Sequence, residues 1–253
     1  GYPIPRFGHL SMIMGADKSK LSKRHGATSI LAYRDMGYLP EAMLNYLVRL
    51  GWSHGDQEIF SVSELVEKFA LDHVQKSSAV FNPDKLLWVN AQYIIHGEPK
   101  RLAEQLRPFL EQAGQGEAVK KIPTEWLEKL VVAFRERVHT LVEMAEAAVP
   151  YLRDQVELDA AAADKFLTQD IAPSLEKLVS YMEDPLFVNP AVRVDSLTAH
   201  LDGMQGFSKA VLEETFKQVL AEDGLKMGQL AQPVRVALTG RTARPGLFEV
   251  IDL

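Results

Sequence analysis

The sequence predicts a mainly α-helical protein, because apolar residues recur every three to four positions and helix-capping residues punctuate the chain. An alternating strand pattern of any length is absent after residue 15. Hydrophobic residues make up 47% and charged residues 25% of the 253 positions, the balance of a soluble globular protein. No apolar run is long enough for a membrane span, and no secretory signal opens the sequence, so we expect a cytoplasmic protein without membrane contact.

Only the first residues depart from the helical pattern. Residues 7–15 predict one short strand, which a polar loop follows. A single strand needs a pairing partner for its backbone groups, so we expect the other strands of its sheet to lie outside this sequence. Residues 246–253 resemble a helix start without a stop signal. Both ends favour a piece of a longer protein over a small domain with frayed ends.

The expected helices follow in order, each with a stated start or stop signal. Proline in the first turn opens a helix over 40–50, and Ser61 with Glu64 forms a capping box for the next. Asn82 caps a helix that ends at Gly97, and Gly114 stops a helix over 99–113.

In the second half, Thr124 is expected to cap a helix, and Thr140 with Glu143 forms a second capping box for a helix ending near Pro150. The remaining helices are expected at 159–168, 171–183, 194–202, 208–222 and 227–239, and from Pro245 onward.

Two basic segments stand out in a chain whose net charge is −6. Residues 1–26 contain five basic residues and one acidic residue, and residues 224–248 contain four basic residues and no acidic one. Two such segments suggest two contacts with a polyanion, although clusters of this size also arise by chance. Cysteine is absent and the seven histidines are scattered, so no metal site and no thiolate chemistry are predicted.

The loop over 17–26 carries the clearest chemical signal. Lys20, Lys23 and Arg24 alternate with small polar residues before Gly26. A mobile cationic loop suits the neutralisation of a triphosphate in a transition state. As a bare pattern it also fits a loop that contacts only solvent.

The string Lys20-Leu21-Ser22-Lys23-Arg24 resembles the KMSKS signature of class I aminoacyl-tRNA synthetases. The resemblance is to bacterial glutamyl-tRNA synthetases in particular. It runs in order through the whole chain, while 150–225 match only in helical character. The matching segments are 25–30, 33–40, 50–53, 81–88, 232–235, 237–240 and 245–249.

The resemblance implies four segments. They are the end of a class I nucleotide-binding catalytic domain with the signature loop (1–26), a helical stem-contact domain (27–97), and two helical anticodon-binding subdomains (98–150 and 151–253). It implies an enzyme that activates glutamate with ATP and Mg and attaches it to glutamate tRNA.

In the signature loop, the resemblance gives Lys23 the role of stabilising the pyrophosphate leaving group. Lys20 and Ser22, with Leu21 and Arg24, are expected to hold the loop on ATP. The companion His-x-Gly-His signature is absent. We therefore expect no adenylate formation and no tightly bound cofactor for this chain alone, and a monomer, as the family suggests.

The resemblance also implies anticodon contacts at two places. Arg135 or Arg137 aligns with the segment that reads the first anticodon base, and ion pairing with Glu136 or Glu143 is the alternative. Arg235 and the loop 241–247 align with a second contact. This loop includes Arg244, whose position often carries a smaller residue in the family, and Leu247, which could stack on a base or belong to the core.

Two other readings of the whole chain remain open. One is a stand-alone helical RNA- or protein-docking module derived from a synthetase. The other is a purely structural helical scaffold, which requires the string at 20–24 to be accidental.

Overall fold

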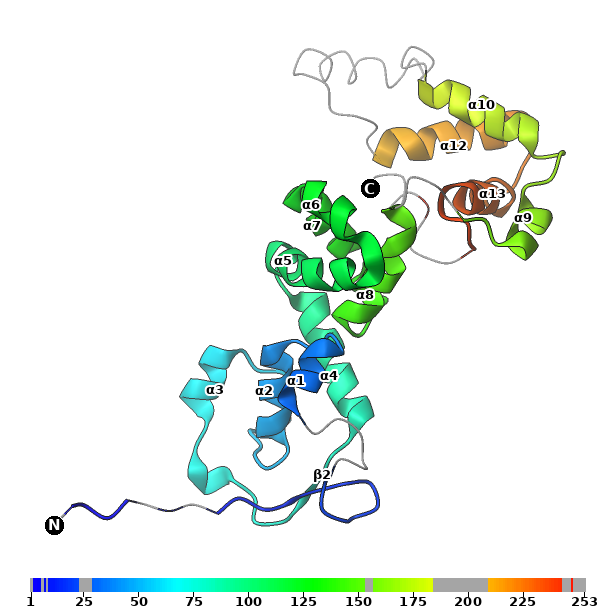
Figure 1. The fold of residues 1–253 in the computed structure, drawn as a ribbon. Helices are drawn as coiled ribbons and strands as arrows, with labels where there is room; N and C mark the ends of the chain where they lie inside the picture. The colour runs from blue at the N-terminus through cyan, green and yellow to red at the C-terminus, as the bar shows by residue number, and fades with distance from the viewer. Residues whose placement is uncertain are drawn as a thin grey trace. The chain divides into compact units, whose positions relative to one another are not determined.

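The computed structural model describes residues 2–5, 7, 9–22, 29–152, 157–183, 209–242 and 247. The chain divides into two compact units (Figure 1). Unit 1 comprises Gly1–Gly116 and Pro123–Ala147, and unit 2 comprises Glu117–Ile122 and Ala148–Leu253. The fold is mostly helical, as predicted.

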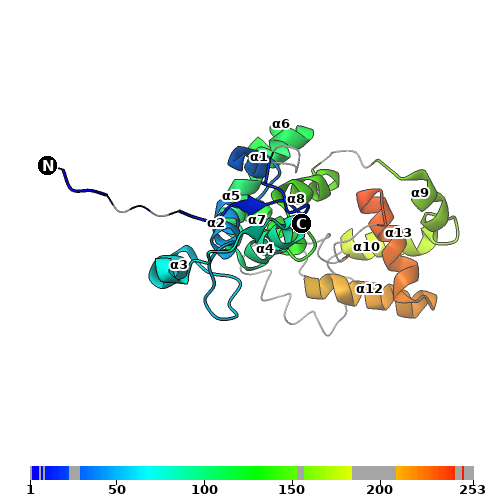
Figure 2. The same ribbon diagram turned by 90° about the horizontal axis from the view of Figure 1, so that it is seen from below.

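Unit 1 combines a minimal parallel strand pair with a set of helices (Figures 1 and 2). Its elements are β1 (Ile13–Met14), α1 (Ile30–Asp35), α2 (Pro40–Arg49), α3 (Val62–Lys68), the 3-10 turn η2 (Leu71–His73), β2 (Ala79–Val80), α4 (Pro83–His96), α5 (Pro99–Leu110), the π-helical turn η3 (Glu111–Gln115), α7 (Thr124–Phe134) and nearly all of α8 (Leu141–Ala148).

Unit 2 contains α6 (Gly116–Lys121) apart from its first residue, and the helices that follow α8 (Figure 1). These are the 3-10 turn η4 (Val149–Tyr151), α9 (Ala160–Phe166), α10 (Ala172–Glu183), α12 (Lys209–Asp223) and α13 (Met227–Thr239). The expected helix at 194–202 lies outside the described residues, and so does the one from Pro245, except for Leu247.

The expectation that the strand partner lies outside this sequence was wrong. β1 pairs in parallel with β2, with Ile13 opposite Ala79 and Met14 opposite Val80. β1 also covers only two of the residues expected in a strand. β2 is equally short, and two residues are too few to produce an alternating pattern that sequence analysis can detect.

The starts of α3 and α4 are capped by the residues that the sequence predicted. Ser61 Oγ accepts a hydrogen bond from Glu64 N, and the Glu64 carboxylate accepts one from Ser61 N. Hydrogen bonds from Ser61, together with those from Gln57 and Lys68, lower the pKa of Glu64 to about 2. Asn82 caps α4 through a bond from Lys85 N at 3.1 Å.

Two other expected helix starts need correction. Thr124 is the first residue of α7 and does not cap it; its hydroxyl instead accepts from Arg107 and donates to Glu104. Thr140 accepts from Glu143 N as expected, but the Glu143 carboxylate accepts from His139 N. Gly114 behaves as expected: its backbone, with φ of +83°, is not helical, so it stops the helix that begins with α5, and α6 is a separate helix beyond this kink.

Two buried amides organise unit 1. Asn90 Oδ1 accepts from Leu39 N at 2.8 Å, and Asn90 Nδ2 donates to His139 O. Asn45 donates to Glu58 O at 2.9 Å and accepts from Phe60 N at 2.8 Å. Both side chains are fully buried. Each provides hydrogen bonds to backbone groups that have no partner within a helix and that water cannot reach.

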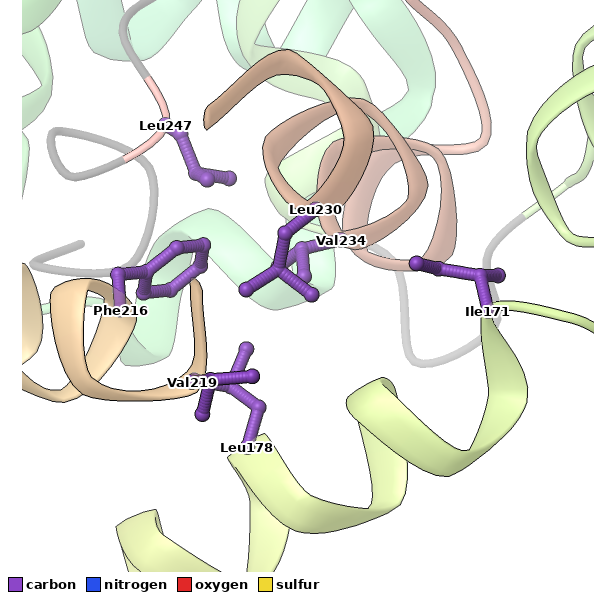
Figure 3. Packing of buried hydrophobic residues seen from close by; sticks show 7 residues of the cluster. All are labelled: Ile171, Leu178, Phe216, Val219, Leu230, Val234 and Leu247. Carbon is purple, nitrogen blue, oxygen red and sulfur yellow. The ribbon is translucent and has the colours of Figure 1, made fainter. Parts of the chain in front are cut away.

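The core of unit 2 is shared by α10, α12 and α13. Figure 3 shows its side chains turned toward one another: Ile171, Leu178, Phe216, Val219, Leu230, Val234 and Leu247. At the edge of this core, Asp223 accepts from Ser174 Oγ at 2.6 Å and pairs with Lys177, which joins α12 to α10. The bond from Lys177 lowers the pKa of Asp223. None of the helices in the described ranges is long and apolar enough to cross a membrane.

Replacing Gly37 with alanine should destabilise unit 1 by more than about 2 kcal/mol. Gly37 has φ of +83°, and an added Cβ would lie 2.6 Å from Val142 N, which belongs to the backbone. Gly55→Ala is the matched control, because Gly55 also has positive φ but has open space around it. Urea unfolding should give a loss of only about 1 kcal/mol for the control. Equal losses would show that the contact with Val142 does not matter.

Replacing Asn90 with alanine should lower the free energy of unfolding by about 2–4 kcal/mol. The change leaves Leu39 N and His139 O without their buried partner. Gln92→Ala on the same helix is the control, since the Gln92 side chain makes no hydrogen bond within the described residues and should change stability by less than about 0.5 kcal/mol.

Candidate functional site

The loop after β1 folds back tightly on its own strand. Leu21 N donates to Ile13 O at 3.0 Å, and Gly15 N donates to Ser19 O at 2.8 Å. Asp17 accepts from both the backbone N and the hydroxyl of Ser19, which closes the turn. The structure therefore gives the first part of the cationic loop a defined backbone next to β1.

This turn presents the first signature residues at the surface. Lys20 is exposed and forms an antiparallel bridge with Met14, while Leu21 and Ser22 are half-buried. Lys23 and Arg24 lie outside the described residues. Lys20 can therefore offer its ammonium group to an anion from a held backbone position, as a phosphate contact requires.

The two candidate arginines between α7 and α8 differ in what they contact. Arg137 donates to Ala133 O, so its guanidinium is engaged with the end of α7. The half-buried Arg135 side chain has no hydrogen bond or ion pair to any described residue. Arg135 therefore forms no ion pair with Glu136 or Glu143 among the described residues, which was the alternative to an anticodon contact. Glu143 instead contacts His139.

The candidate Arg235 lies on α13, one turn after Gln232. Arg235 Nε and Gln232 Oε1 are buried atoms without a hydrogen-bond partner. Thr239, a further turn along, donates to Arg235 O at 2.8 Å. A donor and an acceptor are thus left unsatisfied on one helix face.

Of the two candidates in the loop after α13, only Leu247 is described. It is 5% exposed and belongs to the core cluster with Phe216 and Leu230 (Figure 3). Of the two alternatives left open for Leu247, the structure shows the packing role. Arg244 lies outside the described residues.

Two cavities in unit 1 were not anticipated from the sequence. One, of about 270 Å³, lies among β1, α2 and the segment 69–79, and the buried Trp52 lines it. The other, of about 510 Å³, lies among the α1–α2 connection, α5, η3 and Leu141. Gln105 lines the second cavity, and its Oε1 is buried without a hydrogen-bond partner.

A sequence signal for Gln105 existed. It lies within the apolar stripe of α5 formed by Leu102, Leu106 and Phe109, where a polar residue is unusual. Within the described ranges, no group of three or more histidine or carboxylate side chains could hold a metal ion.

Two protein-family models match the chain in consecutive segments. A model for the catalytic domain of class I tRNA synthetases (E and Q) matches residues 1–88. A model for an anticodon-binding domain matches residues 101–186 and 189–253, more than half of the chain.

Curated relatives and solved structures give the same picture. The chain is 51% identical over 252 residues to a glutamate–tRNA ligase of Geobacter sulfurreducens and 50% identical over 253 residues to one of Syntrophobacter fumaroxidans. Each of these two matches covers 100% of this chain and 49% of the relative. The chain therefore spans about half the length of these relatives.

A crystal structure of a glutamate tRNA ligase from Elizabethkingia meningosepticum, in complex with its amino acid, shares the fold. Its TM-score is 0.76 at 24% identity, covering 99% of this chain and 49% of that one. The chain therefore belongs, over most of its length, to the anticodon-binding domain family. A class I tRNA synthetase catalytic segment precedes that domain, and the chain matches the C-terminal half of glutamate–tRNA ligases.

Proposed function

We propose that this chain is the tRNA-binding portion of a glutamate–tRNA ligase, which activates glutamate with ATP and attaches it to glutamate tRNA. The observation that carries the proposal is the 51% identity along the full chain to a relative with that name. The anticodon-binding family model supports the tRNA contact independently. The four segments proposed are 1–26, 27–97, 98–150 and 151–253, with the roles that the family resemblance implies.

The loop after β1 is proposed to act on ATP. Its described part fits a triphosphate, because Lys20 is exposed on a backbone that Asp17 and Ser19 close into a turn. Lys20 and Ser22 would hold the phosphates, with Leu21 and Arg24 completing the loop, and Lys23 would stabilise the pyrophosphate leaving group. ATP, accompanied by Mg, would supply the adenylyl group that activates the glutamate carboxylate, and pyrophosphate would leave. The ion would be carried by phosphate oxygens, since a Mg site commonly takes few protein ligands.

Arg135 is proposed to read the first anticodon base. Its guanidinium has no partner among the described residues and is therefore available, whereas Arg137 already binds the end of α7. An arginine can donate two hydrogen bonds to a base edge, which suits recognition of a splayed single-stranded base. Arg235, whose Nε is buried without a partner, is proposed as a second anticodon contact, together with Arg244. Leu247 is not proposed to touch a base, because its side chain packs in the core of unit 2.

Replacing Arg135 with alanine should reduce discrimination between glutamate tRNA and a tRNA with a changed first anticodon base by about 1–3 kcal/mol. The measurement is binding of this chain to both tRNAs over a salt series. Phosphate contacts weaken with salt for both tRNAs, while base reading separates the two curves.

Arg137→Ala is the matched control for this experiment. It should lower stability by about 1 kcal/mol through loss of the bond to Ala133 O but leave the separation of the two curves intact. Curves that are already parallel for the unaltered chain would place base reading elsewhere. Absence of tRNA binding would contradict the proposed function and favour a docking module of another kind.

Replacing Lys23 with alanine in a full-length enzyme that contains this chain should lower the rate of adenylate formation by about 100- to 1000-fold. A side chain that contacts only the transition state does not stabilise the fold. The thermal unfolding temperature of Lys23→Ala should therefore equal that of the unaltered enzyme. ATP–pyrophosphate exchange measures the rate. Lys18→Ala in the same loop is the control, because Lys18 is exposed and lies before the signature string. A shifted unfolding temperature with an unchanged rate would contradict the role given to Lys23.

A further inference from the structure

The smaller cavity of unit 1 is an apolar groove beside the strand pair. Its volume is about 270 Å³, and the described residues that line it carry no charged side chain. Most of the wall is aliphatic or aromatic, with contributions from Leu10, Ile13, Leu47, Trp52, Phe69 and Val74. A wall of this composition suits apolar side chains of another polypeptide segment and offers no cation to a phosphate.

Contacts within unit 1 hold this groove in shape. Ser11 Oγ donates to Lys76 O at 2.7 Å, which joins the segment before β1 to the segment before β2. The Trp52 ring packs against the Phe69 ring with centroids 5.9 Å apart. The groove is therefore formed by this chain alone and does not require a partner to assemble it.

The rim of the groove leaves large apolar side chains in contact with water. Leu10 is 78% exposed, Phe69 43% and Leu47 41%. A single exposed leucine is ordinary, but apolar residues that adjoin one another on a surface mark a site of interaction. These three residues line the same groove, so together they form one apolar patch.

The segment that leads into the groove is also apolar and extended. Among residues 2–10, those that the structure describes form no backbone hydrogen bond with another described residue. Figure 1 shows this segment running away from the helices of unit 1. Tyr2, Ile4 and Phe7 are exposed along it. Such side chains leave water only when another part of a protein packs on them.

The strand pair next to the groove lacks the cover that parallel strands have in folded domains. β1 and β2 pair in parallel over two residues each, and Met12 and Val80 remain exposed. Parallel sheets occur almost only where other elements cover both faces, and a two-stranded sheet is marginal in water. The strands, the groove and its rim thus share one uncovered apolar face.

The comparisons indicate what covers this face. All residues that line the groove lie within 1–88, the segment that the catalytic-domain model matches. The chain covers 49% of the ligases of Geobacter sulfurreducens and Syntrophobacter fumaroxidans and matches their C-terminal half. About as many residues again therefore precede the matched region in these relatives. Interfaces between permanently joined parts of a protein are large and apolar, as this face is.

We infer that the groove and its rim, formed by Leu10, Leu47 and Phe69, are the docking surface for the N-terminal half of a ligase that contains this chain. That half places apolar side chains in the groove and over the strand pair. Ile13 O accepts from Leu21 N of the signature loop, so docking against Ile13 also holds the base of that loop. The inference goes beyond the proposed function, because it concerns contact between the two halves and does not require tRNA binding.

The first test measures thiol accessibility, which the sequence allows because the chain contains no cysteine. Leu10→Cys and Phe69→Cys each place a single thiol at the rim of the groove. A maleimide reagent should modify each thiol at least about tenfold more slowly in a full-length ligase that contains this chain than in this chain alone. Mass spectrometry of the modified peptide excludes cysteines elsewhere in the ligase. Equal rates in the two proteins would overturn the proposal.

Val66→Cys is the matched control for the labelling. Val66 is 80% exposed on α3 and does not line the groove. Its thiol should react at the same rate in both proteins, within about twofold. Protection of Val66→Cys as strong as that of the groove positions would show general shielding by the longer protein and would overturn the assignment to the groove.

The same thiols identify the occupant of the groove. In this chain alone, adding glutamate tRNA or raising the protein concentration should leave the labelling rates of Leu10→Cys and Phe69→Cys unchanged. Protection by the tRNA would assign the groove to RNA, and protection that grows with concentration would assign it to a second copy of this chain. Either result would overturn the proposal. A chain that binds no tRNA contradicts the proposed function but leaves the labelling result intact, so the two failures are distinguishable.

Leu10→Glu tests whether docking at the groove supports activity. In the full-length ligase, a carboxylate placed in an apolar interface should lower the rate of ATP–pyrophosphate exchange about tenfold or more. Val66→Glu, at a similarly exposed position, should leave the rate unchanged. In this chain alone both variants should keep the urea midpoint, because both side chains are exposed there. Equal exchange rates for the two full-length variants would contradict the docking role.

Discussion

The buried side chain of Asn90 holds together three parts of unit 1 that are distant in the sequence. Its carbonyl oxygen accepts from Leu39 N before α2, and its amide group donates to His139 O between α7 and α8. Helix ends and connections leave backbone groups without partners, and in a buried place these groups must be satisfied by a side chain. A single amide therefore joins the segment of the catalytic-domain model to the segment of the anticodon-binding model.

Several features of the candidate sites depend on this junction. The connection from α7 to α8 carries Arg135 and Arg137, and Asn90 anchors that connection through His139. The same junction brings Leu39 and Leu141 to one wall of the larger cavity, where Gly37 O accepts from Leu141 N. Glycine is required at position 37 because the backbone of Val142 leaves no space for a side chain. The connection that carries the two candidate arginines and one wall of the larger cavity thus rest on one buried hydrogen-bonded cluster. Unit 2 has no comparable buried amide among the residues that the structure describes, and its helices are joined by apolar packing and the Lys177–Asp223 pair.

Local signals predicted the helices well where the deciding groups are close in sequence. Ser61 and Glu64 satisfy each other's backbone within one turn, and α13 has the bounds that were expected, 227–239. Thr124 failed as a cap because its hydroxyl is bound by Arg107 and Glu104 of α5, which no local pattern could reveal. The strand partner of β1 was missed for the same reason, since the pairing of Ile13 with Ala79 joins distant residues. The sequence singled out the cationic loop and the arginines as predicted contacts, but it gave no sign of the two cavities of unit 1.

The sequence by itself determined the helical class, most helix boundaries, the cationic loop and the family, because each of these depends on residue types at short, fixed spacings. The tertiary structure alone decided which polar groups have a hydrogen-bond partner. It engaged Arg137 with the end of α7 and left Arg135 without a partner among the described residues, and it packed Leu247 into a core. It also buried Gln105 Oε1 without a hydrogen-bond partner. Satisfaction of a polar atom depends on which distant groups come within about 3 Å of it, and that is a property of packing rather than of sequence spacing.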